Sequence, residues 1–437
     1  MKRAKRILVG MGCILLLTLS WITAVAAKTD RQKQEELLAC AKTYLADDIY
    51  ILAVEPLEEA ASFDDDYTQE AEETLKRVYL QLADQSDYNR RYTALLDKQM
   101  TRKDAGAEVF LEAAQYYLVN GKEDEAFSVL RTGIAKTQSE KLFRLYEDTR
   151  YAYTMGRSAY QEVTAIFGGG IQVRMESGWG VANGSGTLVI PCEYDQVSTC
   201  GADRVIVSKN GTISAVDFDN NRVALLHERA EGFGNYADDR LGLQTEDGWI
   251  LSTGEFAIGS LVFEELGMYS DGYAPAKLNG KWGVIDTSGS EWLLPPKYDR
   301  IVQDELGRCY AQGAVFAEQN GQVYLLVDGQ SIGGPYEDAR PFADGWAAVK
   351  QGGKWGFIDR EGTVQVSCQY DEALSFGQHL AAVKVGENWG YISLSGELVI
   401  PAQFQGAKSF SNGSAPVLDR ERWRFITLLE YREGAHL

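Results

Sequence analysis

Few side chains in this 437-residue sequence have the types and spacing that catalysis needs. The three histidines, His227, His379 and His436, fall in no Ser/His/Asp or HExxH arrangement, which argues against a triad hydrolase or a zinc hydrolase. Asp217 opens an acidic stretch, but Arg222 stands where a calcium loop requires glycine, so we predict a polar turn. We expect a protein that is not an enzyme, with no catalytic, cofactor-binding or metal-binding residues.

The cysteines point to packing rather than to chemistry. Five of them follow the N-terminal segment, which is an odd and sparse set without a CxxC pair. Free cysteine packs as a small apolar residue, so we expect most of the five in the core. Cys192 and Cys200 are near enough in the sequence to bridge a local loop, and the sequence leaves open whether they pair.

Carboxylates and aromatic rings also have structural interpretations. Acidic residues are too abundant for pairs of them to indicate acid/base catalysis. Asp286 and Asp359 end corresponding strands, and we expect them to accept hydrogen bonds from N–H groups of the next turn. Four further aromatic residues, namely Trp346, Tyr269, Tyr273 and Phe376, have side chains able to stack on sugar rings, but aromatics that recur with a structural period are typical of a core.

Tryptophan recurs at a nearly fixed interval through the C-terminal two-thirds of the chain. Trp355, Trp389 and Trp423 are 34 residues apart, and Trp249 and Trp282 are 33 apart. The wider spans of 103 residues from Trp179 to Trp282 and of 73 residues from Trp282 to Trp355 leave room for degenerate copies near residues 211 and 321. Such a period indicates a repeat architecture. About eight units result, the last one truncated. The tryptophans that we expect to anchor each unit on its neighbour are Trp179, Trp249, Trp282, Trp355, Trp389 and Trp423.

Each unit combines three strand segments with two turns. The first segment leads through a two-residue turn, typical of type I′ hairpins, into the tryptophan strand, and a glycine turn leads into a third strand that often ends at proline. The glycine after most of these tryptophans is expected to let a backbone or ring approach closely. The predicted unit is a three-stranded antiparallel meander. Its predicted hairpin turns are Ser177-Gly178, Asn210-Gly211, Asp247-Gly248, Asn279-Gly280, Asn320-Gly321 and Gly352-Gly353.

The motifs Lys281-Trp282-Gly283-Val284-Ile285-Asp286 and Lys354-Trp355-Gly356-Phe357-Ile358-Asp359 resemble the bacterial WG-repeat family, also called KWG repeats. Asn388-Trp389-Gly390 follows closely, and the resemblance covers about residues 168–437. The units near 211 and 321 lack the tryptophan, and Trp249 and Trp423 are followed by other residues than glycine. The resemblance implies tandem β repeats of mostly unassigned function, and it brings no catalytic residues. We expect the array to close into a propeller-like ring rather than an open β-solenoid, because closure removes free strand edges.

Residues 28–167 have a different pattern. Alanine, leucine, glutamate and lysine recur there with helical spacing, and small residues such as Ala41, Ala113 and Gly133 stand where a tetratricopeptide unit places its closest helix crossing. The region looks like a tetratricopeptide array of three hairpins plus one or two further helices; the alternative is an unrelated helical domain. The glycine triplet Gly168-Gly169-Gly170 marks the expected boundary to the β domain, residues 168–437. The fold class predicted is α+β multidomain.

Residues 1–27 begin with a basic stretch and continue with an apolar run that ends near Ala24-Val25-Ala26. This is the outline of a secretory signal peptide, and the apolar run is also long enough to serve as an uncleaved signal anchor. Either interpretation places the remaining chain outside the cytoplasm, with membrane contact only through this segment if it is uncleaved.

The charge and the repeats together limit the class of partner. The net charge is −20, and −24 without residues 1–27, which argues against nucleic acid and anionic membrane as main partners. We expect an exported repeat scaffold that binds a protein or peptide partner at the cell envelope. The alternative is a module that binds cell-wall glycan.

Overall fold

The computed structural model describes residues 30–64, 66–201, 204–219, 221–225, 230–253 and 258–430. The chain divides into two compact units, residues 1–146 and 147–437. Helices form the first unit and antiparallel strands nearly all of the second, so the chain is an α+β multidomain protein. The expected signal peptide or anchor, residues 1–27, lies outside the described residues.

Helices in the described residues succeed one another across short turns, which gives three hairpins and one further helix. Small residues lie where the helices approach most closely: a Cβ added to Gly133 would lie 2.7 Å from Cβ of Phe110 and 2.8 Å from Leu142. The helical segments are residues 30–46, α2 (Tyr50–Ala60), α3 (Thr68–Gln81), α4 (Ser86–Met100), α5 (Ala107–Val119), α6 (Glu123–Thr137) and α7 (Glu140–Thr149).

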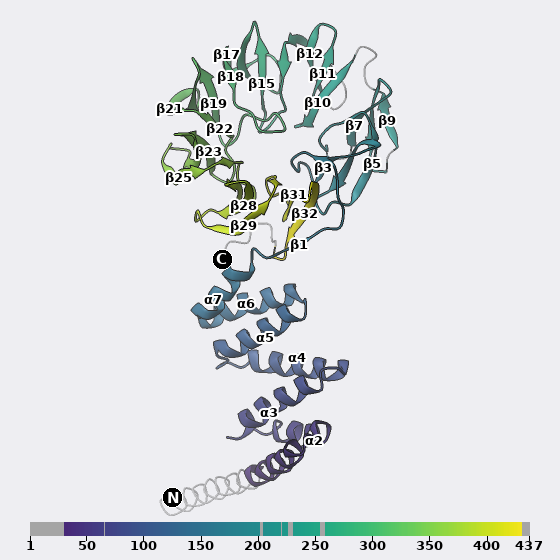
Figure 1. Cartoon of the computed structure of the whole chain (residues 1–437), viewed down its shortest axis with the longest axis vertical. Helices are drawn as coiled ribbons and strands as arrows, with labels where there is room; N and C mark the ends of the chain where they lie inside the picture. The colour runs from purple at the N-terminus through teal and green to yellow at the C-terminus, as the bar shows by residue number, and fades with distance from the viewer. Residues whose placement is uncertain are drawn as a thin grey trace, which may run out of the picture. The chain divides into compact units, whose positions relative to one another are not determined.

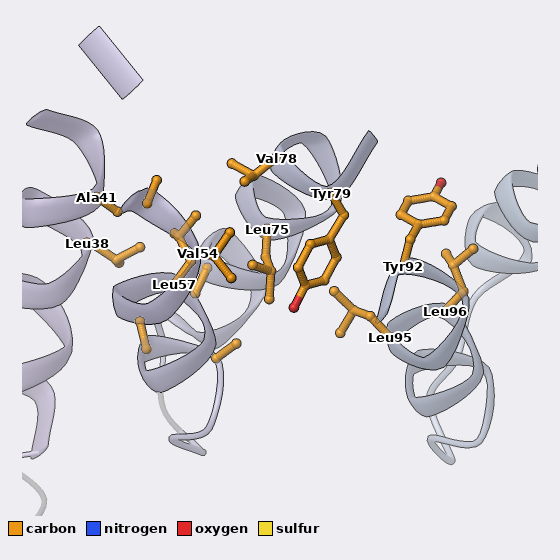
Figure 2. Close-up of a cluster of buried hydrophobic side chains, with 14 of the residues drawn as sticks. Leu38, Ala41, Val54, Leu57, Leu75, Val78, Tyr79, Tyr92, Leu95 and Leu96 are labelled. Carbon is orange, nitrogen blue, oxygen red and sulfur yellow. The ribbon is translucent and has the colours of Figure 1, made fainter. Parts of the chain in front are cut away.

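The helices share a continuous apolar core. Leu75 and Tyr79 project from α3 into the space between α2 and α4, where they meet Leu57 and Leu95 (Figure 2). The hydroxyl of Tyr79 donates a hydrogen bond of 2.6 Å to Glu58, so this ring is buried with its polar end satisfied.

A buried carboxylate joins α3 to the end of α4. Glu72 has no exposed side-chain surface; it accepts hydrogen bonds from Gln99 Nε2 at 3.0 Å and Arg102 Nη2 at 2.6 Å, and Lys98 Nζ lies 3.2 Å away. Burial by itself raises the pKa of Glu72, but these donors outweigh it and hold the pKa below its ordinary value. The charged form of Glu72 is therefore part of the folded helical unit.

Eight four-stranded antiparallel sheets, which we call blades 1 to 8, form a ring in chain order (Figure 1). The second unit is an eight-bladed propeller, which confirms the ring over the open solenoid. Blade 1 is β2 (Glu162–Val163), β3 (Gly170–Met175), β4 (Gly178–Asn183) and β5 (Leu188–Tyr194); blade 2 is β6 (Gln196–Val197), β7 (Arg204–Lys209), β8 (Thr212–Asp217) and β9 (Arg222–Leu225); blade 3 is β10 (Gly232–Ala237), β11 (Arg240–Thr245), β12 (Gly248–Thr253) and β13 (Ile258–Phe263); blade 4 is β14 (Glu265–Leu266), β15 (Tyr273–Leu278), β16 (Lys281–Asp286) and β17 (Trp292–Tyr298).

The remaining blades repeat this order until the last one. Blade 5 is β18 (Arg300–Ile301), β19 (Ala314–Gln319), β20 (Gln322–Val327) and β21 (Gln330–Tyr336); blade 6 is β22 (Asp338–Ala339), β23 (Trp346–Gln351), β24 (Lys354–Asp359) and β25 (Val364–Tyr370); blade 7 is β26 (Glu372–Ala373), β27 (Leu380–Val385), β28 (Asn388–Ser393) and β29 (Leu398–Phe404); blade 8 is β30 (Gly406–Ala407), β31 (Ser414–Asp419), β32 (Arg422–Leu428) and β1 (Tyr153–Met155).

Each blade has four strands, which corrects the three-stranded unit expected from the sequence. The additional strand is the short segment that follows the link between units, such as β26 directly after Tyr370 and Asp371. It is two residues long in most blades, and two residues are too few to show the alternation by which a strand is recognised.

The eighth blade is completed by a strand from the start of the second unit. β1 pairs antiparallel with β32, so that Tyr153 lies opposite Leu428, and β1 and β32 lie side by side in Figure 1. The last unit, which is truncated in the sequence, thus takes its missing strand from the segment that precedes blade 1. Since β1 and β2 already belong to the ring, the division between the units lies before Glu147, whereas the predicted boundary, Gly168–Gly170, follows β2 and includes the first residue of β3.

Two-residue turns join the second and third strands. Asn210, Asn279, Asn320 and Gly352 have φ of 51°, 52°, 55° and 63°, and the glycine after each also has positive φ, as a type I′ turn requires. Blades 1 and 3 differ from the prediction. Their turns lie one residue earlier, at 176–177 and 246–247, and the glycine that was assigned to the turn already pairs in the strand.

Apolar side chains fill the spaces between neighbouring blades. Phe357 and Val366 of blade 6 pack with Ala373 and Phe376 of blade 7, and equivalent clusters lie at the other blade interfaces. The core of the propeller is therefore a series of interfaces, because a single sheet cannot bury both of its faces.

Candidate functional site

Six of the eight blades line a cavity at the centre of the ring. In each of these six blades the lining comes from the segment between the first and second strands. The first strands therefore face the centre of the ring, which we call the channel. The cavity has a volume of about 680 Å³, within the range of small-molecule sites. Its charged lining residues are Asp271, Asp304, Glu305, Arg308, Arg340, Asp344 and Lys408.

Blade 5 carries an insertion in its lining segment. Twelve residues, 302–313, separate β18 from β19, whereas six residues, 340–345, separate β22 from β23 in blade 6. We call residues 303–308 the channel loop. Its Asp304 carboxylate accepts hydrogen bonds from the N–H groups of Leu306 at 3.0 Å and Arg308 at 2.9 Å, which holds the loop in a compact turn.

The channel loop reaches blades on the opposite side of the ring. Leu306 is buried with apolar side chains of blades 1, 3 and 4. Asn235 Nδ2 of blade 3 donates to the carbonyl of Leu306 at 2.9 Å, and the N–H of Met268 in blade 4 donates to the carbonyl of Gly307 at 2.9 Å. The loop therefore occupies the part of the channel beside blades 1, 3 and 4, and the cavity remains chiefly beside blades 4 to 8.

Lysine and arginine occupy corresponding positions in the channel wall of blades 8 and 6. The N–H groups of Lys408 and Arg340 both donate to the second strand of their blade, at 2.9 and 2.8 Å. Lys408 forms an ion pair with Glu305 of the channel loop, and its ammonium lies 5.5 Å from the ring centre of Trp423. The Arg340 guanidinium lies 4.5 Å from the ring centre of Trp355. Each cation thus rests on a repeated tryptophan.

A row of ion pairs connects the first strands of blades 5, 6 and 7. Arg300 bonds Glu318 at 2.7 Å and Asp338 at 3.0 Å. Arg340 lies 3.3 Å from the same Asp338 and 3.5 Å from Glu372. Hydrogen bonds with Glu318 and Asp338 outweigh the lowering effect of burial and raise the pKa of Arg300. These charges belong to one alternating chain and not to a catalytic pair.

Hydroxyl groups tie neighbouring blades together at the cavity wall. Ser375 Oγ donates to the carbonyl of Pro341 at 2.7 Å, and Ser409 Oγ donates to the carbonyl of Ser375 at 2.8 Å. Both hydroxyl hydrogens are donated to backbone carbonyls of the propeller, which is not the arrangement that activates a serine nucleophile.

The predicted tryptophan anchors all lie at blade interfaces. Trp355 is 3% exposed and belongs to the core between blades 6 and 7. The other five are half-buried and pack against the neighbouring clusters; they are Trp179, Trp249, Trp282, Trp389 and Trp423.

Carboxylates at the links between blades cap the hairpin turn of the blade that they introduce. Asp195 accepts a hydrogen bond from the N–H of Asn210 at 2.7 Å, and Asp371 accepts one from the N–H of Gly386 at 2.8 Å. Glu264, Asp299 and Glu337 do the same for Gly280, Asn320 and Gly353, and the amide of Gln405 does so for Glu421.

Carboxylates at the ends of the third strands hold the following turn, as the sequence predicts. Asp359 accepts hydrogen bonds from the N–H groups of Glu361 at 3.1 Å and Thr363 at 2.7 Å. Asp286 bonds Ser288 Oγ at 2.6 Å and the N–H of Glu291 at 3.2 Å. The recurrent acids of the repeat are thus engaged with backbone and hydroxyl groups.

The residues singled out for metal or redox chemistry do not assemble. Asp217 accepts hydrogen bonds from the N–H groups of Asp219 and Asn221, at 3.0 and 2.8 Å, and so forms the predicted polar turn. Within the described ranges no group of three or more His, Cys, Asp or Glu is arranged to hold a metal ion. His379 lies on an exposed turn, while His227 and His436 fall outside the described residues.

The cysteines are free, and most of them are buried. Cys192 and Cys200 do not form a disulfide, which answers the question that the sequence left open. Burial raises the pKa of Cys200 to about 11 and also raises the pKa of Cys309. Thiols with raised pKa values are poor nucleophiles, so these two residues pack as apolar side chains.

The aromatic residues considered for sugar stacking are partly withdrawn from solvent. Tyr269 and Phe376 are each 2% exposed and belong to the blade cores, while Tyr273 and Trp346 are half-buried. Phe376 packs edge-on against Trp346 with ring centres 5.3 Å apart. The four rings therefore do not present a common stacking face.

Sequence reasoning did not single out the charged residues of the cavity. Its one usable signal was the interval from Trp282 to Trp355, which exceeds two 34-residue periods by five residues and so marks an insertion. The insertion is the channel loop, which carries Glu305 and Arg308.

The interval between tryptophans, the order of the strands and the glycines of the turns are the features that recur from blade to blade. Six segments match the family model of the WG containing repeat, at residues 179–212, 252–282, 282–304, 336–355, 355–389 and 389–423. The propeller is built from WG repeats. Each matched segment begins or ends at a tryptophan of the third strand, so a WG repeat spans parts of two successive blades.

Solved structures share only a distant likeness with this chain. The surface component PorZ of the type-IX secretion system of Porphyromonas gingivalis is 11% identical over 62% of this chain and 42% of its own, with a TM-score of 0.30. The Pan2 WD40 domain of Neurospora crassa is 9% identical over 64% and 91%, with a TM-score of 0.35. The extracellular domain of a putative hybrid two-component system from B. thetaiotaomicron is 7% identical over 64% and 40%, with a TM-score of 0.35.

This chain spans less than half the length of PorZ and of the two-component system domain. No curated protein matches it. Across the described residues, none of the helices combines the length and apolar character needed to span a membrane.

Proposed function

We propose that this protein is a non-enzymatic scaffold that is exported to the cell envelope and binds another protein there. The observation that carries the proposal is that the recurrent carboxylates of the repeat form hydrogen bonds within the propeller itself. The acids at blade links and strand ends bond to turns of the scaffold, as Asp371 does with Gly386 and Asp359 with Thr363. A repeat whose recurrent carboxylates serve its own architecture has no repeated chemistry to offer a substrate, and its surfaces remain for binding.

Within this proposal the helical unit is a tetratricopeptide-like array that holds the partner. The three successive hairpins and the close crossing at Gly133 support this assignment. Apolar side chains are exposed at the first hairpin, where Ile51 is 48% and Leu52 is 51% exposed on α2. Exposed apolar residues on adjacent positions are a feature of protein interaction surfaces.

Capture from an envelope extract tests the proposal. Residues 28–437 serve as bait, beside a variant with Ile51→Asp and Leu52→Asp and a control variant with Val364→Asp. Val364 is 59% exposed on β25 of the propeller, so the control changes an equally apolar surface residue outside the helical unit. We expect a discrete protein on the unmodified chain and on the control, and its loss from the helical variant.

Other results contradict the proposal in defined ways. Loss on the control alone places the docking surface on the propeller and removes the helical unit from the proposal. Retention of purified wall material in place of a protein supports the glycan alternative. Retention of neither contradicts the scaffold function itself.

A further inference from the structure

The channel loop places a carboxylate beside a lysine in the wall of the cavity. Glu305 comes from blade 5 and pairs with Lys408 of blade 8, so the contact spans the open part of the channel. Glu305 is 32% exposed and Lys408 20% exposed as side chains, and the ion pair is therefore in contact with the cavity solvent. Glu305 thus shows that Lys408 binds a carboxylate at this point of the cavity wall.

The surrounding wall suits one carboxylate better than a longer anion. Arg340 stands at the level of Lys408 two blades away, and Leu374 of blade 7 lies at the same level between them. The apolar side chain of Leu374 between the two cations can contact the carbon skeleton of a ligand. The net charge of −20 opposes the approach of a polyanion.

We propose that the central cavity binds a ligand through a carboxylate group that replaces Glu305 on Lys408. The ligand is a small carboxylic acid or the free C-terminus of a polypeptide, since both present the same group. Glu305 then acts as a tethered substitute that occupies the site until the ligand displaces it. Exposed ion pairs are weak, so an external carboxylate can compete with this internal one.

The site is independent of the partner that the helical unit binds. All of its residues belong to the propeller, and the capture of a protein by α2 does not involve them. Failure of either proposal therefore leaves the other standing.

Titration calorimetry with glutarate on the full chain tests the site. The Glu305→Gln variant removes the competing charge and frees Lys408, so we expect its Kd for glutarate to be at least about tenfold lower than that of the unmodified chain. The matched control is Glu265→Gln, which removes an equal charge and one ion pair, with Lys277, outside the cavity lining. The control should bind glutarate as the unmodified chain does.

The role of the cation is tested in the Glu305→Gln background. Lys408→Met keeps an unbranched apolar stem against Trp423 and should abolish glutarate binding. Lys408→Gln provides a second variant if the first fails to fold, which circular dichroism reports. Unchanged binding in either folded double variant would overturn the proposal, as would equal affinities of Glu305→Gln and Glu265→Gln.

A pair of peptides distinguishes the two sources of the carboxylate. Acetyl-Ala-Ala is tested with a free C-terminus and as its amide. Tighter binding of the free acid than of glutarate identifies a polypeptide terminus, and the reverse order identifies a small acid; both outcomes sustain the site. Equal binding of the free acid and the amide shows that the carboxylate is not recognised and overturns the proposal.

Discussion

The glycine that follows the repeated tryptophan is required by a backbone contact. A Cβ added to Gly180, Gly283, Gly356 or Gly390 would lie 2.4–2.5 Å from a carbonyl oxygen of the fourth strand. In each of these blades the register shifts beside the glycine, so a bulge carries that carbonyl toward it. The expectation of a close backbone approach is confirmed at these positions.

In blade 5 the glycine that permits the close backbone approach lies on the fourth strand instead of the third. Tyr324 stands at the position of the glycine there, and Gly334 of β21 provides the missing space: a Cβ on Gly334 would lie 2.8 Å from the carbonyl of Val323. The unit without tryptophan thus keeps the bulge and moves the glycine to the other strand.

Gly356→Ala should destabilise the propeller by about 1–3 kcal/mol, because the new methyl group forces the backbone of β25 away. The shift of the urea midpoint, followed by tryptophan fluorescence, measures this loss. Gly184→Ala is the control, since a Cβ at Gly184 meets nothing within 4 Å. Equal urea midpoints for the two variants would show that the close contact with the carbonyl of Val366 does not affect the stability of the propeller.

Ring closure depends on one short strand. β1 supplies the fourth strand of blade 8 and pairs only with β32, where the N–H of Gly156 donates to the carbonyl of Phe425 at 2.7 Å. Tyr153 packs against the core between blades 7 and 8, with its ring centre 6.1 Å from that of Phe404. Without β1, the edge of β32 would be free to pair with another chain.

A propeller that begins at residue 160 should therefore associate, whereas one that begins at residue 147 and keeps β1 should remain monodisperse. We expect the shorter chain to unfold at least about 2 kcal/mol more easily, because it loses a strand and the cover of Tyr153. Light scattering and urea unfolding measure the two effects. A shorter chain that is equally stable and monodisperse would show that closure of the ring does not need this strand.

The two units differ in how they hold their carboxylates. In the propeller, hydrogen bonds from Lys281 and from the N–H of Asn320 lower the pKa of Asp299, but this residue lies at the surface, where solvent screens ion pairs and makes them weak. In the helical unit, the buried Glu72 accepts hydrogen bonds that hold its pKa below the ordinary value in spite of burial. The helical unit thus depends more strongly on a single ionised group.

Acid should unfold the helical unit before the propeller. A pKa lowered by folding contributes stability that is present above the ordinary carboxyl value of about 4.3 and is lost as the pH falls through the lower, folded-state pKa. We expect the helical circular dichroism at 222 nm to fall in this range while propeller tryptophan fluorescence persists.

Glu72→Gln tests the cause of this acid transition. The variant should lose about 1–3 kcal/mol near neutral pH, and the acid dependence of its stability should flatten. Glu36→Gln, on an exposed position of the first helical segment, is the charge-matched control and should keep the original profile. An unchanged acid profile in Glu72→Gln would assign the transition to other groups.

Periodicity determined much of the architecture from the sequence alone. The tryptophan interval, the Asn-Gly turns and the glycine after Trp282 or Trp355 are local features, since a turn needs particular φ values and a bulge needs a residue without a side chain. These features predict the number of units and most of the turns. The choice of a ring rests on a different argument, namely that closure removes free strand edges.

Tertiary structure alone decided the features that depend on long-range contact. The first strand of most blades is too short to recognise, and its existence follows from pairing with the second strand. β1 closes the ring only because residue 153 lies opposite residue 428. Lys408 and Glu305 are 103 residues apart in the chain, so only the closed ring brings them together. The repeat itself follows from local backbone geometry, whereas the cavity exists because segments distant in the sequence converge on one axis.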